Sequence, residues 1–230
     1  MTHLHFNILT LFPELFPGPL EASITGKALD KNIWSYNAVN IRDYATDNYR
    51  SVDDTPFGGG AGMVMRADIL EAALLSIDNP GRQIYMSPRG KPLTQQLVTQ
   101  ISEETALTLL CGRYEGVDQR FLDVHGFEEI SIGDYVLAGG EIPALALMES
   151  CIRLLPGAVG NADTPVEESF SNPHLLEYPH YTKPAQWTAA DGRTYAVPDV
   201  LRSGDHGKIA DWRAEKAQDI TRKNRPDLLK

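Results

Sequence analysis

Residues 131–142 read SIGDYVLAGGEI, and this stretch says more about the fold than any other part of the chain. It places three glycines between an apolar, strand-like segment and the start of a helical pattern. Two further stretches have the same form: YMSPRG (85–90) follows one apolar run and CGRYEG (111–116) follows another. Ligands of parallel α/β sheets bind outside the carboxyl ends of the strands. Three glycine-bearing loops at such ends therefore predict a pocket for a compact polar ligand.

Glycines in these loops have two explanations. Gly133, Gly139 and Gly140 carry no Cβ, which lets the main chain approach a ligand closely. Alternatively, each glycine only turns the chain, which explains one loop equally well but three strand ends less well. The loops are not common nucleotide motifs, because GGGAGM (58–63) lacks the P-loop lysine and no G-x-G-x-x-G follows the first strand.

Strand and helix patterns alternate through most of the chain. Such alternation predicts an α/β fold with a mostly parallel sheet and helices on both faces. The expected strands are 4–12, 33–41, 82–87, 106–111 and 128–133, and the expected helices are 24–31, 66–78, 94–104, 117–126 and 142–155.

A second, smaller unit is expected after a composition shift at Pro156. A polar stretch follows it, and then a helix over about 207–221 that either Ser203 or Asp205 can cap. The apolar stripe of this helix is Ile209, Trp212, Ala217 and Ile220.

The loop DDTPFGGGAGM (53–63) has four glycines within six positions. Ordering so many glycines is entropically costly, which favours a functional lid or a surface for a flat base. A floppy surface loop explains the composition equally well, and the sequence leaves both open.

Composition indicates an ordinary globular protein of 230 residues, with 42% hydrophobic and 23% charged residues. The net charge of −10 argues against a chain that coats itself in nucleic acid. Residues 1–180 hold 11 basic and 24 acidic side chains, whereas 181–230 hold 10 and 7. The basic tail hints at a polyanionic partner, although a solvated helix surface is an equal explanation.

Cys111 and Cys151 are the only cysteines, and both lie in segments expected to be buried. We expect core thiols of a cytoplasmic protein, and no cysteine–histidine spacing suits zinc. The longest apolar helical run, 142–155, is too short to span a bilayer. We therefore expect no membrane segment and no metal site.

Taken together, the motifs resemble those of the bacterial tRNA (guanine-N(1)-)-methyltransferases, which belong to the SPOUT superfamily. The matching runs cover nearly the whole chain in order. They include TLFPELF (10–16), VDDTPFGGGAGM (52–63), SPRG (87–90), LLCGRYEGVDQR (109–120), SIGDYVLAGGE (131–141), PGAVGN (156–161), EYPHYTKP (177–184), VPDVL (197–201), SGDHGKI (203–209) and RPDLL (225–229).

The resemblance implies a deep trefoil knot at the C-terminal part of the first domain. It implies three parts: a cofactor-binding domain over 1–160, a linker over 161–176 and a small, mainly helical tRNA-binding domain over 177–230. Two chains are expected to pair as a homodimer, with each active site at the interface and the tRNA lying across both.

The implied cofactor is S-adenosylmethionine, bound bent in the knot. The family's cofactor contacts fall on Tyr85, Met86, Pro88, Gly112, Tyr114, Glu115, Ser131, Ile132, Gly133, Asp134, Tyr135, Val136, Leu137, Gly139, Gly140 and Pro143. Its substrate contacts fall on Gly58, Gly59, Gly60, Lys183 and His206. On this basis, Gly140→Val should block the cofactor and leave the fold intact.

Two residues match the family's catalytic groups. Glu168 stands where the family has an aspartate that acts as general base. Arg153 matches an arginine that stabilises negative charge on the guanine. An i,i+4 ion pair with Glu149 is the structural alternative for Arg153. Lys183, where an arginine is usual, keeps the charge and loses the planar fork.

The implied reaction is methylation of ring nitrogen 1 of the guanine on the 3′ side of the anticodon, position 37. Two alternatives remain open: a SPOUT methyltransferase acting on another RNA, and a non-catalytic RNA-binding protein that keeps the pocket. Whether Mg²⁺ assists is also left open by the sequence.

Overall fold

The computed structural model describes residues 3–159, 168–170, 172 and 174–229. The chain divides into two compact units, Met1–Ala162 and Asp163–Lys230, and each is described by itself. Within the described helices, none is both long enough and apolar enough to cross a bilayer.

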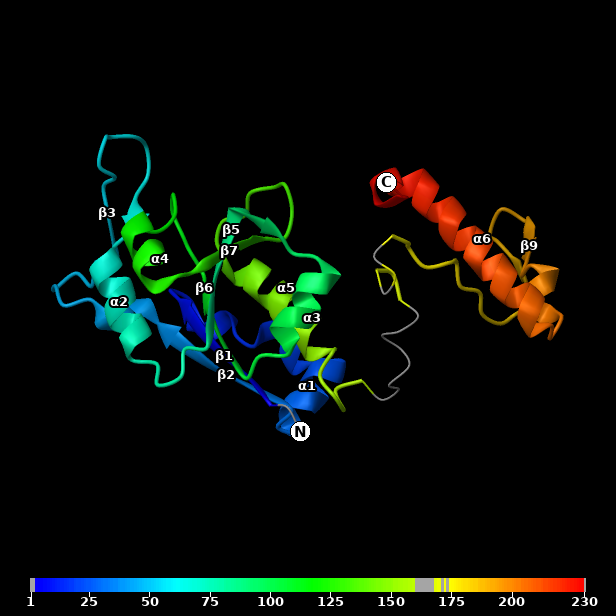
Figure 1. Cartoon of the computed structure of the whole chain (residues 1–230), viewed down its shortest axis with the longest axis horizontal. Helices are drawn as coiled ribbons and strands as arrows, with labels where there is room; N and C mark the ends of the chain where they lie inside the picture. Colours follow the sequence, from blue (N-terminus) through cyan, green and yellow to red (C-terminus); the bar gives the residue numbers. More distant parts are fainter. Residues whose placement is uncertain (1–2, 160–167, 171, 173, 230) are drawn as a thin grey trace. The chain divides into compact units, whose positions relative to one another are not determined.

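A five-stranded sheet forms the centre of the first unit (Figure 1). Every neighbouring pair is parallel, and the strand order is β2-β1-β6-β5-β7. The strands are β1 (Leu4–Thr10), β2 (Trp34–Asn40), β5 (Arg82–Pro92), β6 (Ala106–Leu110) and β7 (Glu128–Ser131). The α/β architecture expected from the alternating pattern is thereby confirmed.

Helices cover both faces of this sheet, because successive side chains of a strand point to opposite sides. Phe6 and Ile8 belong to the core under one layer of helices, whereas Leu9 belongs to the core under the other. The first layer is α1 (Ser23–Asp30), α3 (Gln95–Ser102) and α5 (Glu141–Ile152); the second is α2 (Ala67–Leu75) and α4 (Gln119–His125).

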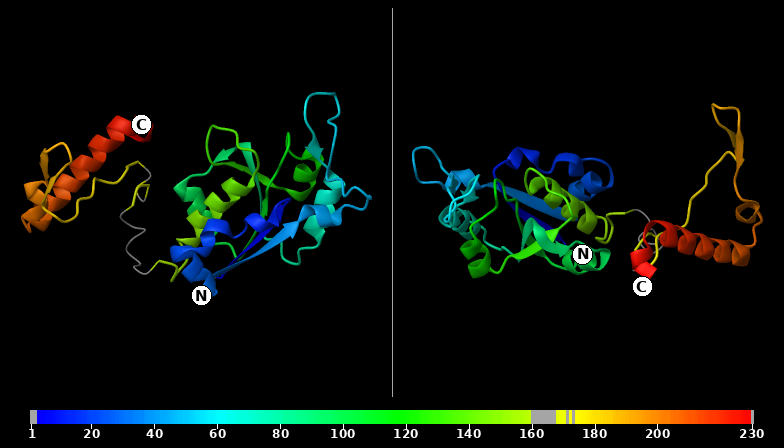
Figure 2. Two further views of the ribbon diagram at one scale, coloured as in Figure 1. Left: turned by 180° about the vertical axis from the view of Figure 1, so that it is seen from behind. Right: turned by 90° about the horizontal axis from the view of Figure 1, so that it is seen from above.

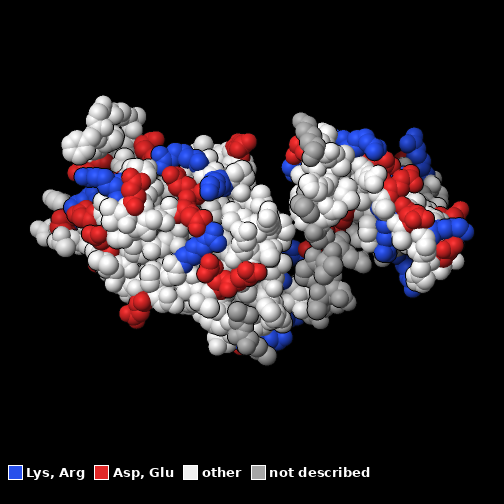
Figure 3. Space-filling view, viewed as in Figure 1, with Lys and Arg blue, Asp and Glu red and all other residues white. Residues whose placement is uncertain are grey.

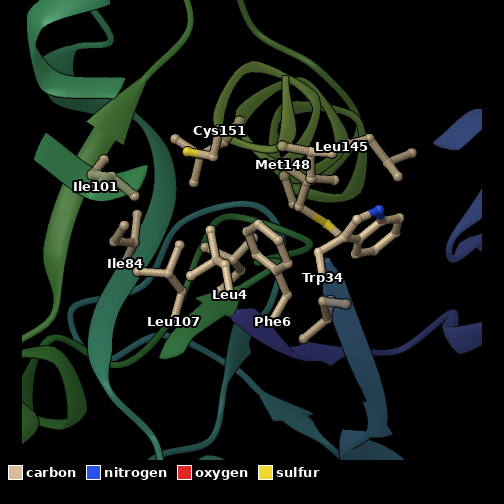
Figure 4. Packing of buried hydrophobic residues seen from close by; sticks show 14 of the residues in the cluster. Leu4, Phe6, Trp34, Ile84, Ile101, Leu107, Leu145, Met148 and Cys151 are labelled. Carbon is tan, nitrogen blue, oxygen red and sulfur yellow. The ribbon is translucent and has the colours of Figure 1, made fainter. Parts of the chain in front are cut away.

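The larger core lies between α5 and the sheet. Figure 4 shows Met148 of α5 directed toward Trp34 and Phe6 of the strands, and Cys151 of α5 on the side of Ile101. Trp34 is fully buried, and its Nε1–H donates to the Thr25 carbonyl oxygen of α1 at 2.9 Å. An aromatic ring of this size, with its one polar atom satisfied, fixes β2 against α1.

Local signals set the helix ends. The Thr94 hydroxyl accepts from the Leu97 N–H at the start of α3, and the Asp118 carboxylate accepts from the Arg120 N–H at the start of α4. Gly126 ends α4 in the left-handed conformation, with φ of 67°. The described part of this unit also has three short 3₁₀ helices: η1 (Pro13–Leu15), η2 (Gly18–Glu21) and η3 (Ile41–Tyr44).

The glycine-rich loop joins two short antiparallel strands, β3 (Asp53–Asp54) and β4 (Val64–Met65). Figure 1 and the left view of Figure 2 show this cyan loop standing out from the body of the first unit. Met65 N–H donates to the Gly116 carbonyl oxygen, so β4 is fastened to the loop that follows β6.

The second unit contains one long helix, α6 (His206–Asn224), which extends beyond the expected range. Asp205, one of the two expected caps, accepts from the Lys208 N–H at 3.1 Å. On the predicted stripe, Ala217 is buried, whereas Ile209, Trp212 and Ile220 are half-buried. The unit also has a hairpin that the sequence pattern did not predict, β8 (Gln186–Thr188) with β9 (Thr194–Ala196), and the 3₁₀ helices η5 (Asp199–Arg202) and η6 (Pro226–Leu229).

Both units carry intermingled charges on the face shown in Figure 3. Basic and acidic side chains alternate over short distances there. Charge sign alone therefore marks no polyanion-binding face on either unit in this view.

Candidate active site

A cavity of about 320 Å³ lies where β5, β6 and β7 deliver their loops. These three strands are neighbours in the sheet and run parallel, so their carboxyl ends meet at one edge. Of the sixteen residues predicted to bind a cofactor, all but Asp134 line this cavity. The members are Tyr85, Met86, Pro88, Gly112, Tyr114, Glu115, Ser131, Ile132, Gly133, Tyr135, Val136, Leu137, Gly139, Gly140 and Pro143.

The first of the three loops differs from the prediction, in which the strand ends at residue 87 and a loop follows. Strand β5 continues to Pro92, and the stretch between Met86 and Lys91 bulges out of register with β7. Arg89 fixes the bulge, because its guanidinium binds the Glu129 carboxylate at 3.1 Å and the Gln119 side chain at 3.1 Å. A bulge next to a cavity re-aims side chains without ending the strand.

The second loop, 111–118, is held from both sides. Gly112 lies so close to the Tyr85 ring that a Cβ would come within 2.7 Å of Cε2. On the other side, Glu115 N–H donates to the Met63 carbonyl oxygen at 3.0 Å. Tyr114 adopts a φ of 60°, a left-handed conformation that is strained for a tyrosine and that often occurs at binding sites.

The third loop is closed by its own side chains and by the second loop. The Ser131 hydroxyl donates to the Gly133 carbonyl oxygen at 3.0 Å. The Gly140 N–H donates to the Gly112 carbonyl oxygen at 3.0 Å, which joins the start of α5 to the end of β6.

This contact corrects the expectation for Gly140→Val. A Cβ at position 140 would lie 2.7 Å from the Cys111 Cα, which is backbone and cannot move aside cheaply. The variant would therefore strain the fold instead of only blocking a ligand. At Gly112 and Gly140 the missing side chain lets segments of the protein pack together, which the sequence argument attributed to ligand approach.

A buried ion pair lies behind the third loop. Glu141 is 1% exposed and accepts from the Thr10 hydroxyl at 2.9 Å. The Arg113 guanidinium binds the same carboxylate, with Nη2 2.9 Å from Oε2 and Nε 3.2 Å from Oε1. Arg113 also donates to the Ala138 carbonyl oxygen and stacks over the Phe12 ring at 4.4 Å. One arginine thus connects the second loop, the third loop and the end of β1.

Burial shifts the pKa of the cavity residue Tyr85 and of the two core cysteines. Desolvation raises the pKa of the Tyr85 hydroxyl and raises that of the Cys111 thiol well above its ordinary value. Burial also raises the pKa of Cys151 to about 12. Both cysteines are free and buried, as expected, and neither has the thiolate character of a nucleophile.

The two predicted catalytic residues lie in different units. Arg153 directly follows α5, and its backbone N–H donates to the Glu149 carbonyl oxygen at 3.1 Å. Glu168 is half-buried in the second unit, whereas its neighbour Glu167 lies outside the described residues.

None of the five predicted substrate residues is among the residues that line the cavity. Gly58, Gly59 and Gly60 sit in the exposed loop between β3 and β4, all with positive φ. In the second unit, Lys183 is exposed and His206 is the first residue of α6.

Several cavity residues were missed by the sequence reasoning. Arg113 and Gly116 lie inside the quoted CGRYEG motif and could have been found there. Ser87, Arg89, Ile130 and Ala138 adjoin predicted residues in the chain, and Val117 directly follows Gly116.

Comparisons with known proteins agree with the motifs. A family model described as tRNA (Guanine-1)-methyltransferase TrmD matches residues 4–230. A tRNA (guanine-N(1)-)-methyltransferase of Rhodospirillum rubrum is 56% identical over 222 residues, which are 96% of this chain and 90% of the relative. Enzymes of the same name are 54% identical in Mesorhizobium japonicum (97% and 95% covered) and 53% identical in Rhodopseudomonas palustris (96% and 88% covered). The chain therefore belongs to the tRNA (guanine-N(1)-)-methyltransferase family.

Proposed function

We propose that this chain transfers a methyl group from S-adenosylmethionine to ring nitrogen 1 of the guanine at position 37 of tRNA. The observation that carries the proposal is the cavity, because the residues that match the family's cofactor contacts converge on it. Family membership supports the tRNA substrate.

The cavity residues fit such a cofactor chemically. Tyr114 and Tyr85 offer aromatic surfaces for a purine, and Leu137 and Pro143 offer apolar contact. The carboxylate of Glu115 is available to a positively charged group on the same ligand. When bound, S-adenosylmethionine supplies an electrophilic methyl group on a sulfonium centre.

Glu168 and Arg153 are proposed to activate the guanine. Guanine N1 carries a proton and is a poor nucleophile until that proton leaves, and the Glu168 carboxylate accepts it. Negative charge then grows on the guanine O6 oxygen, and the Arg153 guanidinium stabilises it. Glu168 has one methylene more than the family's aspartate and the same proton-accepting oxygens.

The proposal includes the family's knotted path and its homodimer, in which each site combines residues of two chains. Arg153 of one chain would then act with Glu168 of the other. The tRNA would lie across both chains and contact the glycine loop at 58–60, Lys183 and His206.

The direct test uses methyl-labelled S-adenosylmethionine and two tRNA transcripts that differ only in guanine or adenine at position 37. Mass analysis of nuclease digests should find 1-methylguanosine at position 37 of the first transcript and no label in the second. Label on another position or another RNA would support a different methyltransferase. No label with any RNA, together with intact cofactor binding, would support a non-catalytic RNA-binding protein.

A subunit-mixing experiment tests the shared site. Arg153→Ala and Glu168→Gln homodimers should each be inactive, since general-base assistance alone is worth roughly 10²–10⁴-fold. A mixed dimer has one site with neither defect, so mixing should restore activity. Native mass spectrometry must confirm subunit exchange, and unrestored activity in verified mixed dimers would refute the two-chain site.

A further inference from the structure

The second unit has a hollow of about 460 Å³ at the N-terminal half of α6. Tyr178, His206, Ile209, Ala210 and Arg213 line it. Tyr178, His206 and Arg213 can bind a ligand through polar or aromatic groups. All five residues lie within the second unit, so one chain supplies the whole lining of the hollow.

Arg213 is held in a defined position within this hollow. Its guanidinium carbon lies 4.7 Å from the centre of the Tyr178 ring, a cation–π contact. Its Nε is buried and has no hydrogen-bond partner among the described residues. A buried donor without a partner is rare and costly, so such an atom commonly meets a water, an ion or a ligand.

The other arginines of this unit differ from Arg213 in one respect. Each lies within ion-pair distance of an aspartate that follows or precedes it closely in the chain. These pairs are Arg193–Asp191 at 3.6 Å, Arg202–Asp199 at 3.7 Å, Arg222–Asp219 at 3.3 Å and Arg225–Asp227 at 2.7 Å. Within the described part of the unit, Arg213 has no such carboxylate, so its charge is available to an anion from outside.

We propose that this hollow binds a backbone phosphate of the tRNA, with Arg213 as the main contact and His206 beside it. A guanidinium whose plane is fixed by stacking presents its N–H fork to phosphate at little entropic cost. The inference rests on the proposed function, because that function supplies the polyanion, and it adds a contact that the motifs do not assign.

The test compares Arg213→Met with Arg222→Met. The two arginines are nine positions apart on α6, which is two and a half turns, so they lie on opposite faces of the same helix. For Arg213→Met, the KM for tRNA should rise about tenfold or more, as expected for a lost charged hydrogen bond. The slope of log affinity against log salt should fall by about one, since one phosphate contact is lost.

Three readings must stay unchanged if the hollow only binds tRNA. The Arg213→Met variant should keep the wild-type single-turnover rate at saturating tRNA, the wild-type affinity for S-adenosylmethionine and the helical circular dichroism signal. Arg222→Met should match the wild type in KM and in salt slope. Equal behaviour of the two methionine variants, or a wild-type salt slope in Arg213→Met, would overturn the proposal.

A second variant protects the test against misfolding. Arg213→Lys keeps the charge and loses the fork, so it should keep the wild-type salt slope and still raise the KM for tRNA. A wild-type KM in Arg213→Lys together with a misfolded Arg213→Met would assign Arg213 a structural role and refute the phosphate site. Failure of the wild type to methylate tRNA would instead refute the proposed function, so the two failures are distinguishable.

Discussion

Removing the charge of Arg113 should destabilise the first unit more than removing a comparable surface charge. Arg113→Met keeps a long apolar side chain beside Phe12 and deletes the guanidinium. The Glu141 carboxylate is 1% exposed, and it would then retain the Thr10 hydroxyl and lose both contacts to arginine. A buried carboxylate without its cation is one of the few causes of a large single-residue effect.

The expected loss follows from the burial of the two partners. Breaking a buried ion pair by removing one member costs about 3–5 kcal/mol. The side chain of Arg113 is 23% exposed, so water reaches part of the pair, and we expect a loss at the lower end, about 3 kcal/mol. The double variant Arg113→Met/Glu141→Leu buries no charge and should recover at least about 1 kcal/mol of that loss.

Urea unfolding, followed by Trp34 fluorescence, measures this effect in the correct unit. Trp34 is fully buried in the first unit, whereas the other two tryptophans, Trp187 and Trp212, lie in the second. Replacing those two by phenylalanine leaves one local probe. The matched control is Arg66→Met, because the Arg66–Asp68 pair is 33% and 62% exposed and should contribute no more than about 1 kcal/mol.

Two outcomes would refute the reasoning about Arg113. In the first, the double variant is no more stable than Arg113→Met, so the unpaired charge is not the source of the cost. In the second, Arg66→Met loses as much stability as Arg113→Met, so burial does not distinguish the pairs. An unchanged m-value is needed for either comparison, since a changed m-value indicates altered unfolding instead.

Three further predictions follow from the site. Tyr114→Gly relieves the backbone strain of a tyrosine in the left-handed conformation, so the variant should melt no earlier than the wild type. Calorimetric titration should find weaker S-adenosylmethionine binding, and an unchanged affinity would show that Tyr114 does not contact the cofactor. Burial raises the pKa of Cys111 and Cys151, so a thiol reagent at pH 8 should label the protein only after urea unfolding. The hydrogen bond from Arg120 lowers the pKa of Asp118 in the folded state. The stability lost in Asp118→Asn should therefore be constant above about pH 4 and vanish as the pH falls further. A stability difference that persists at low pH would contradict the direction of this pKa shift.

Periodicity predicted the central sheet because its inner strands β1 and β6 are buried on both faces and lie between helical patterns. Residues 106–110 are all buried, and such an apolar run indicates a central strand even in isolation. The hairpin of β8 and β9 was not predicted, since strands of three exposed residues are too short to carry a periodic signal. The bulge in β5 was also missed, because the sequence does not show that strand β7 pairs on both sides of it.

In the candidate site, too, the features set by local sequence could be predicted, and the contacts between distant segments of the chain could not. The three glycine-bearing loops predicted the cavity because each follows a strand and parallel strands bring those ends together, whereas the individual lining residues came from the family resemblance. The pairing of Arg113 with Glu141 could not be predicted, because the two are 28 residues apart and meet only once α5 packs beside β6. The same holds for Gly112 and Gly140, whose reason for being glycine is the approach of other chain segments.

These contacts distinguish the cavity, whose loops are joined to each other, from the glycine loop. The second and third loops are joined by the Gly140–Gly112 hydrogen bond and by Arg113, so the protein itself sets the shape of the cavity. A ligand entering such a site pays little for ordering it. By contrast, a Cβ built on any residue from Gly58 to Gly60 meets nothing within 4 Å, so these three positions lie in open space, whereas Gly62 packs against the Glu115 side chain. If tRNA contacts this loop as proposed, ordering the loop would cost backbone entropy, so we expect tRNA binding, and not cofactor binding, to change the loop's conformation.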